Sequence, residues 1–228
     1  MDVVEEGVCR LEVNGRAVAV WSASPGGERA LAVGRLVADG FLREAGDLVD
    51  VTVHTDESGV RVLAVVLAPA AAERGFAERA HRSACRLGTL HFLVCDVAAL
   101  RAPRASPPPA SSELAGLMRE LFAGSPSRGM HSAGLVEEGR LIDRVEEVGR
   151  HNAVDRAIGA AVLLGQPRGA LGLIVSSRIS GEIALKAARA GLAWVASRSI
   201  PTTLAVRLAE AGGLPLVARA GAVREEGG

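Results

Sequence analysis

The C-terminal part of the chain alternates between short apolar runs and segments with helical periodicity. Consecutive strands joined by helices pair in parallel through right-handed crossovers, and the sheet they form is buried on both faces. The predicted strands are Leu171–Val175, Leu192–Ala196 and Leu214–Ala218, and the helices between them are Gly181–Ala190 and Pro201–Ala211. Gly191 and Gly212 stand where these helices end, and Pro201 stands in a first turn. This pattern predicts a layered α/β domain.

The N-terminal region is predicted to combine hairpins and helices. Residues 8–21 alternate apolar and polar side chains around Asn14-Gly15, a strong signal for a tight hairpin turn. A second hairpin pattern occupies residues 48–67. Apolar residues at helical spacing predict helices over Glu28–Leu42 and from Pro69 to about Ala80.

Residues 101–112 form the only low-complexity segment, Arg-Ala-Pro-Arg-Ala-Ser-Pro-Pro-Pro-Ala-Ser-Ser. Three consecutive prolines favour extended polyproline II geometry, so we interpret the segment as a linker rather than as a ligand for a proline-binding module. We therefore expect a mixed α/β (α+β) protein with a β/α region at 1–100, a linker at 101–112 and an α/β domain at 113–228. The further elements predicted in that domain are helices Glu113–Phe122 and Ala153–Leu164 and a hairpin of Ser132–Val136 with Arg140–Val145.

The composition excludes several classes of protein. Lys+Arg and Asp+Glu number 26 each, so no net charge attracts nucleic acid or an anionic membrane. No apolar run reaches the roughly 18 residues of a membrane span, and the acidic N-terminus does not resemble a signal peptide. Three irregularly spaced cysteines leave at least one free thiol, which fits a reducing compartment. The sequence therefore indicates a cytoplasmic protein.

Cys85 is the candidate nucleophile. It lies in a short segment after His81 and Arg82 and directly before Arg86. Nearby positive charge lowers the pKa of a thiol and raises the share of reactive thiolate. The alternative is that Cys85 is a small buried side chain, as most free cysteines are. The local sequence does not separate the two interpretations.

Hydroxyl and arginine side chains follow the predicted parallel strands. Ser177-Arg178 follows the first strand, and Ser197–Ser199 with Thr202-Thr203 follows the second. Ligands of open α/β sheets bind at such positions, where helices begin with free backbone N–H groups. The same residue types also cap helices in proteins that bind nothing. Taken together with Arg150-His151 at another helix start, they favour an anionic ligand.

Other site types are not supported by motifs. The chain lacks both G-x-x-x-x-G-K-[ST] and G-x-G-x-x-G, and its histidines and cysteines show no H-x-x-x-H or C-x-x-C spacing for a metal. His131 precedes a strand and can be a structural histidine. Glu146 and Glu147 are either a solvated turn or residues that orient Arg150 and His151.

Residues 146–155, Glu-Glu-Val-Gly-Arg-His-Asn-Ala-Val-Asp, resemble the E-D-[IV]-G-R-H-[NV]-A-[VL]-D signature of the FdhD family, the formate dehydrogenase accessory sulfurtransferases. The similarity continues, in order, over nearly the whole chain. The other matching segments are Val13–Gly15, Ser24-Pro25, Ala32–Gly34, Asp39-Gly40, His131, Ser176–Arg178 with Ser180 and Glu182, and Thr202–Val206.

The resemblance implies a function and a set of partners. Members of the family are described as homodimers that take sulfur as a persulfide from a cysteine desulfurase. They pass it to the bis-guanine-dinucleotide molybdenum (or tungsten) cofactor, which activates formate dehydrogenase. The C-terminal domain is expected to resemble the three-layer cytidine-deaminase fold, and GDP is expected to bind as a fragment of the cofactor.

The resemblance also implies the site residues. Cys85 falls on the persulfide cysteine of the family's C-G-x-C-G loop. Residues expected to contact the cofactor are Arg150, His151, Ser177, Arg178, Thr202, Thr203, Arg219 and Arg224. Supporting roles are expected for His81, Arg82, Arg86, His131, Glu147 and Asp155.

The chain departs from the family pattern at two places. Gly88 stands where the second loop cysteine is expected and Arg86 where the first loop glycine is expected, and in the segment 219–224 only Arg224 keeps the family residue. A cofactor-binding chaperone without sulfur transfer, or a paralogue for another molybdoenzyme, is therefore the alternative. A zinc deaminase, suggested by fold analogy, is excluded because the chain has neither an H-x-E or C-x-E motif nor a P-C-x-x-C motif.

Overall fold

A computed structural model describes residues 3–84, 106–123 and 129–220, with residues 81–84 as backbone only. The chain is a mixed α/β protein built on two sheets. The N-terminal sheet has the order β2-β1-β4-β3, with β1 (Gly7–Val13), β2 (Arg16–Ala23), β3 (Leu48–Thr55) and β4 (Arg61–Leu67). Both predicted hairpins are confirmed. Asn14 and Gly15 have φ values of 48° and 77°, the left-handed pair that a two-residue hairpin turn requires.

Two helices accompany the N-terminal sheet. They are α1 (Glu28–Ala38) and α2 (Pro69–Ala84). The predicted helix from Glu28 thus ends before Asp39-Gly40, and Gly40 takes a φ of 85°. β1 and β4 are parallel neighbours in the middle of the sheet.

The C-terminal sheet is mixed and has the order β6-β5-β7-β8-β9. Its strands are β5 (His131–Glu137), β6 (Arg140–Glu147), β7 (Gly172–Val175), β8 (Trp194–Ser197) and β9 (Leu216–Val217). β7, β8 and β9 run parallel as predicted, whereas β5 runs antiparallel to both β6 and β7.

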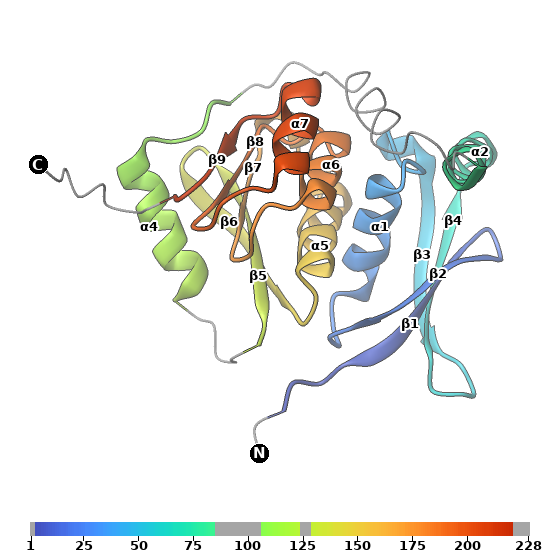
Figure 1. The fold of residues 1–228 in the computed structure, drawn as a ribbon. Helices are drawn as coiled ribbons and strands as arrows, with labels where there is room; N and C mark the ends of the chain where they lie inside the picture. Colours follow the sequence, from blue (N-terminus) through green and yellow to red (C-terminus); the bar gives the residue numbers. More distant parts are fainter. Residues whose placement is uncertain (1–2, 85–105, 124–128, 221–228) are drawn as a thin grey trace, which may run out of the picture.

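Helices cover both faces of this sheet, which makes three layers. One face packs against α4 (Ser111–Phe122), whose buried Leu114, Leu117, Met118 and Leu121 share a cluster with Ile174 and Trp194. The other face packs against α5 (Arg150–Leu163), α6 (Gly181–Arg189) and α7 (Thr203–Gly212). Figure 1 shows this order of layers, with α1 next to α5 and the N-terminal sheet beyond.

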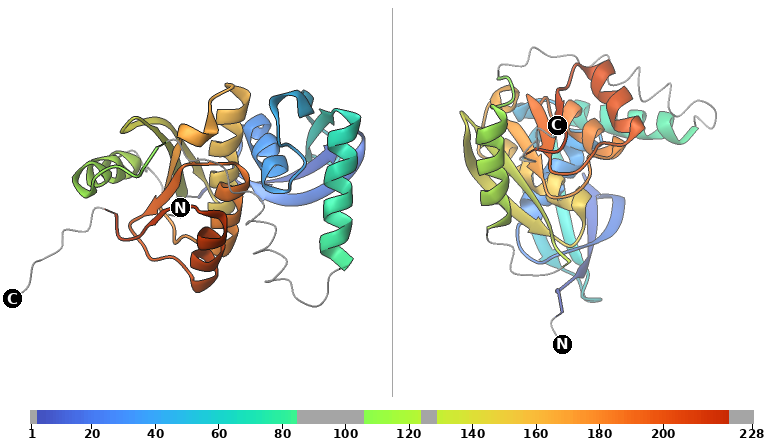
Figure 2. Two further views of the ribbon diagram at one scale, coloured as in Figure 1. Left: turned by 90° about the horizontal axis from the view of Figure 1, so that it is seen from above. Right: turned by 60° about the vertical axis from the view of Figure 1, so that its left-hand side comes forward.

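Gly34 in α1 and Gly159 in α5 let these two helices, and with them the N-terminal and C-terminal parts of the protein, pack closely together. α1 and α5 lie side by side in both Figure 1 and Figure 2. A Cβ atom on Gly34 would stand 1.7 Å from the carbonyl oxygen of Asp155, and one on Gly159 would stand 1.8 Å from that of Ala30. Only glycine fits such backbone contact. One hydrophobic core runs from the N-terminal sheet through α1 and α5 to the C-terminal sheet.

Some predicted boundaries are wrong by a few residues. α7 begins at Thr203 rather than Pro201, because the Thr202 side chain accepts a hydrogen bond from the Ala205 amide and caps the helix. The left-handed residue after α7 is Gly213, with φ 61°, rather than Gly212. α4 starts at Ser111, inside the segment predicted as linker. Each helix in the described ranges is too short or too polar to span a membrane.

Candidate functional site

The strand order brings the predicted ligand residues to one edge of the C-terminal sheet. His131 begins β5 and pairs in register with Glu147 at the end of β6. The Ser132 amide donates to Ser176 Oγ at 2.8 Å, and the Ser176 amide donates to the Ser132 carbonyl at 2.9 Å. The start of β5 therefore lies beside the ends of β6 and β7, from which α5 and α6 depart. We call this side of the sheet, where β6, β7 and β8 end, the carboxyl edge. Ligands of α/β sheets bind at such an edge.

The serines and threonine at this edge shape the starts of α6 and α7. Ser180 Oγ accepts from the Ile183 amide at 3.4 Å, and Thr202 caps α7, so the capping alternative holds for Thr202. Buried Ser197 donates to the Ser177 carbonyl at 2.7 Å and accepts from the Ser199 amide at 3.0 Å. The two loops after β7 and β8 are thereby tied together.

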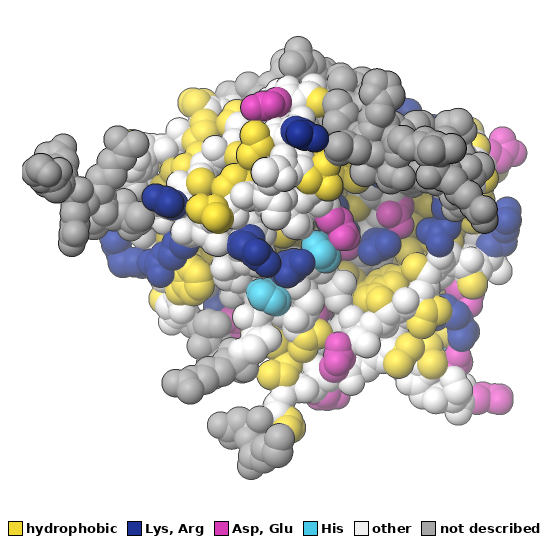
Figure 3. All heavy atoms as spheres, in the orientation of Figure 1, with side chains coloured by type: hydrophobic (Ala, Val, Ile, Leu, Met, Phe, Trp, Pro, Cys, Tyr) yellow, Lys and Arg dark blue, Asp and Glu magenta, His cyan; other side chains and the backbone are white. Residues whose placement is uncertain are grey.

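The exposed positive charges at this edge come from arginines. Arg150 is the first residue of α5, Arg178 follows β7, and both are exposed, as is Thr203. Arg219 follows β9 with a left-handed φ of 53°, and its amide donates to the Ser199 carbonyl. Figure 3 shows arginine or lysine and histidine side chains gathered in the middle of the face that Figure 1 presents. Such a surface suits an anion.

The two histidines of the edge favour their neutral forms. Burial and the nearby Arg150 lower the pKa of His131. Burial also lowers the pKa of His151; Glu182 opposes this, and Lys186, Arg150 and Arg35 reinforce it. His151 Nε2 lies 3.3 Å from Ser180 Oγ and 3.5 Å from Glu182 Oε2. His151 is thus held between the starts of α5 and α6.

Glu147 does not hold Arg150, which corrects the sequence-based hypothesis. Glu147 is fully buried at the end of β6 and forms an ion pair with Arg156. It also accepts a hydrogen bond from the Ser24 amide at 2.9 Å, while the Val148 amide donates to Ser24 Oγ at 3.1 Å. Arg150 lies at the exposed helix start, whereas Arg156 lies further along α5, where the carboxylate meets it. The motif residue Glu147 therefore fastens the turn before α1 to the start of α5.

Asp155 is also internal. It is 1% exposed, and Lys186 Nζ, 3% exposed, lies 2.6 and 2.7 Å from its two carboxylate oxygens. Burial raises the pKa of Asp155, and Lys186 opposes that shift. The pair joins α5 to α6. The residues predicted from the sequence do not include Lys186, the partner of Asp155. Its position on the apolar side of α6, as the only lysine of the chain, is a signal that indicates a buried ion pair.

The candidate nucleophile follows α2 directly. Cys85, Arg86 and Arg224 lie outside the described residues, as do the side chains of His81 and Arg82. Contacts with Phe41 anchor α2 to the N-terminal part of the protein. Its Gly75 allows contact with Phe41, because a Cβ there would stand 2.0 Å from the Phe41 ring, and Phe76 meets that ring edge to face at 5.2 Å.

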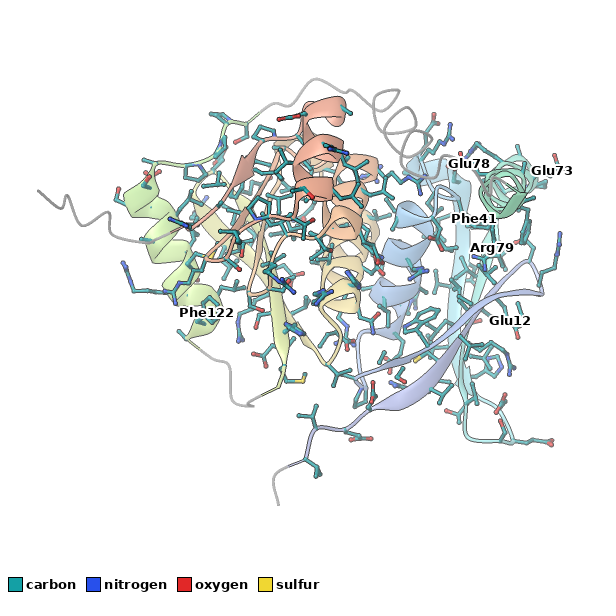
Figure 4. All side chains as sticks on the ribbon, in the orientation of Figure 1. Glu12, Phe41, Glu73, Glu78, Arg79 and Phe122 are labelled. Carbon is teal, nitrogen blue, oxygen red and sulfur yellow. The ribbon has the colours of Figure 1, made fainter. Side chains whose placement is uncertain are left out.

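Two arginines fix the direction of α2. Arg74 Nη2 donates to Asp47 at 2.7 Å, and Arg79 Nη2 donates to the Val18 carbonyl at 2.7 Å. In Figure 4, Phe41 is labelled beside the α2 side chains Glu78 and Arg79. The chain therefore enters the cysteine segment from an anchored helix.

Cys9 is a different kind of thiol. It is fully buried in β1, and burial raises its pKa, so little thiolate forms at neutral pH. Within the described ranges, no three His, Cys, Asp or Glu side chains are grouped so as to hold a metal ion.

Comparison with known proteins places this geometry in a family. A sequence model described as the FdhD/NarQ family matches residues 4–226. "Sulfur carrier protein FdhD" of Streptomyces avermitilis is 36% identical over 247 residues, covering 94% of this chain and 82% of the relative. The protein of the same name from Bacillus pumilus is 31% identical over 214 residues, covering 92% and 81%.

A solved structure agrees with the fold. The crystal structure of a protein assigned as a formate dehydrogenase accessory protein from Desulfotalea psychrophila aligns with a TM-score of 0.73 over 95% of this chain and 84% of that one. The two are 23% identical, so this likeness establishes the fold alone.

Proposed function

This chain belongs to the FdhD/NarQ family, and from that premise we propose that it is a sulfur carrier in the maturation of formate dehydrogenase. The observation that carries the proposal is the family match over residues 4–226, together with relatives that bear the name sulfur carrier protein. We place the activity in the cytoplasm, where a free thiol stays reduced. A cysteine desulfurase, the catalytic subunit of formate dehydrogenase and a second copy of the chain are the partners.

Cys85 receives the sulfur in this proposal. Its thiolate attacks the outer sulfur of a desulfurase persulfide, a new S–S bond forms on Cys85, and the desulfurase cysteine leaves as a thiolate. Arg82, Arg86 and His81 precede or follow it in the sequence and supply positive charge that favours the thiolate and the persulfide anion. Burial and the raised thiol pKa of Cys9 argue against that residue as the carrier.

The acceptor is the bis-guanine-dinucleotide molybdenum or tungsten cofactor, bound as a substrate at the carboxyl edge of the C-terminal sheet. Exposed Arg150, Arg178 and Arg219 offer charge-assisted hydrogen bonds to its phosphates. The capped starts of α6 and α7 add backbone N–H groups. Arg224 continues this basic edge in the sequence.

Intact-mass analysis after treatment with a cysteine desulfurase and cysteine tests the carrier step. We expect one added sulfur, removable by a reductant, in the wild type and in Cys9→Ser and Cys95→Ser. Cys85→Ser should lose both the adduct and the activation of a client formate dehydrogenase. An adduct on Cys9 or Cys95, or client activation by Cys85→Ser, would contradict the proposal.

A chaperone that binds the cofactor without carrying sulfur is the second candidate, favoured by Gly88 at the place of the second loop cysteine. The labelling experiment separates the two. A long-lived adduct on Cys85 supports the carrier, since Gly88 provides no neighbouring thiol to release the sulfur. Absence of any adduct, with nucleotide binding retained, supports the chaperone.

Thermal unfolding with GDP tests whether the cofactor binds at the carboxyl edge. A ligand that binds only the folded state stabilises it by about 2.7 kcal/mol at a hundredfold excess over its dissociation constant. We expect GDP, and not ADP, to raise the unfolding temperature. Arg150→Ala should weaken the effect while leaving the fold intact, and Arg140→Ala, at the exposed first position of β6, is the control. An Arg150→Ala protein that fails to fold would show that Arg150 is structural.

A further inference from the structure

A small pocket lies away from the carboxyl edge, at the C-terminal ends of α1 and α5. Its volume is about 110 Å³, and it is lined by Val37, residues 42–45, Val162, Gly165, Gln166 and Arg168. Val37, Leu42 and Val162 provide an apolar part, and Arg168 and Gln166 provide polar groups. The pocket lies between the segment that follows α1 and the segment that follows α5. A hydrogen bond links the two segments, because Arg168 Nη2 donates to the carbonyl of Arg43 at 2.9 Å.

Arg168 is the unusual residue of this pocket. Its side chain is half-buried in the short 3₁₀ turn Arg168–Ala170, and burial alone lowers its pKa. No carboxylate in the described part of the chain forms an ion pair with it, whereas the neighbouring Arg43 is paired with Glu78 of α2. Among the described residues its guanidinium donates to the Arg43 carbonyl only, so its remaining N–H groups can donate to an anion.

The surroundings favour a singly charged anion over a phosphate. The pocket offers one positive charge that has no carboxylate partner among the described residues, and exposed Glu44 at its rim opposes a dianion. The partial negative charge at the C-terminal ends of α1 and α5 opposes a doubly charged anion more strongly than a singly charged one. A ligand that fills the pocket also needs a hydrocarbon group to contact Val37, Leu42 and Val162. A volume of about 110 Å³ equals roughly four water molecules at 30 Å³ each, which admits a carboxylate with a short chain.

We infer that this pocket binds a short-chain monocarboxylate, with its carboxylate on Arg168 and its chain against Val37, Leu42 and Val162. The inference is independent of the sulfur-carrier proposal, since no residue of the pocket belongs to the carboxyl edge or to the cysteine segment.

Thermal unfolding of the full-length protein in sodium formate, acetate, propionate and butyrate tests the inference, with sodium chloride holding the ionic strength. Each added methylene should tighten binding about fourfold, as expected for burial of one CH₂ group. Inorganic phosphate should stabilise the protein less than butyrate. Phosphate binding as tight as butyrate, or no dependence on chain length, would overturn the assignment.

Two variants locate the site. Arg168→Gln should weaken butyrate binding about tenfold through loss of charge-assisted hydrogen bonds, whereas Arg207→Gln, on the exposed side of α7, should not change it. Gln166→Glu places a carboxylate of the protein beside Arg168 and should weaken butyrate binding without removing the contact to Arg43. If Arg168→Gln does not fold, Gln166→Glu decides alone. Butyrate binding unchanged in Gln166→Glu refutes the site.

Discussion

Replacement of Gly34 by alanine should push α1 away from α5 and destabilise the protein. The new Cβ would lie 1.7 Å from the Asp155 carbonyl oxygen, and contacts under 3.0 Å are essentially never seen. That oxygen belongs to the helix backbone and has no rotamer by which to move away, so α1 and α5 must separate by more than an ångström. Overpacking of this kind typically destabilises by 1–3 kcal/mol and sometimes by more. The opened apolar interface adds to that loss.

The expected net effect is a fall of about 3 kcal/mol in the free energy of unfolding, after the gain of up to about 1 kcal/mol that alanine brings to a helix. For a protein of this size that corresponds to a fall of about 6–12 °C in Tm. Gly116→Ala in α4 is the matched control, since only the Arg119 side chain lies near its Cβ position, at 3.8 Å. It should stabilise by about 0.5–1 kcal/mol.

Urea unfolding followed by circular dichroism measures both variants. A Gly34→Ala protein as stable as Gly116→Ala would show that α1 and α5 do not meet at backbone distance. A changed m-value in Gly34→Ala with an unchanged midpoint would point to altered compactness instead of lost stability.

Three further predictions concern buried and half-buried ionisable groups. Lys186→Met should destabilise by about 3–5 kcal/mol in urea unfolding because Asp155 loses its partner, and Asp155→Asn in the same background should restore part of the loss. Iodoacetamide should label Cys9 far more slowly in the folded protein than in urea, and equal rates would contradict its burial and raised thiol pKa. The lowered pKa values of His131 and His151 mean that the unfolded chain binds protons more readily, so stability should be fully present above pH 6.5 and fall as the pH drops through the folded pKa values. Unfolding of His151→Asn between pH 7 and pH 5 should show a smaller fall, and an unchanged slope would count against this assignment.

The elements that the sequence predicted correctly are those with local signals. Asn14-Gly15 specifies its own turn, and Gly191 takes the left-handed conformation expected after a helix, with φ 71°. The carboxyl edge was also predictable, since parallel strands end on the same side of a sheet. Local sequence could not distinguish Pro201 from Thr202 as the start of α7, because both residues favour helix starts.

Features that depend on distant residues were not predictable from the sequence. The parallel pairing of β1 with β4 joins residues about fifty positions apart and leaves no local pattern. The pairing of Glu147 with Arg156 depends on which face of α5 meets the turn at Ser24, and that follows from the packing of α1. Within the family-like segment 146–155, the structure therefore separates internal residues such as Glu147 and Asp155 from the exposed Arg150.

The packing of α1 against α5 also sets an order for folding during synthesis. α1 is complete at Ala38, but the helix that covers it begins at Arg150. At about 5–20 residues per second, a ribosome needs roughly 6–22 s to make the intervening chain. Throughout that interval the side of α1 that packs against α5 in the folded protein has no partner. We therefore expect the early chain to expose apolar surface that chaperones recognise, and the α1–α5 interface to form only after α5 has been synthesised.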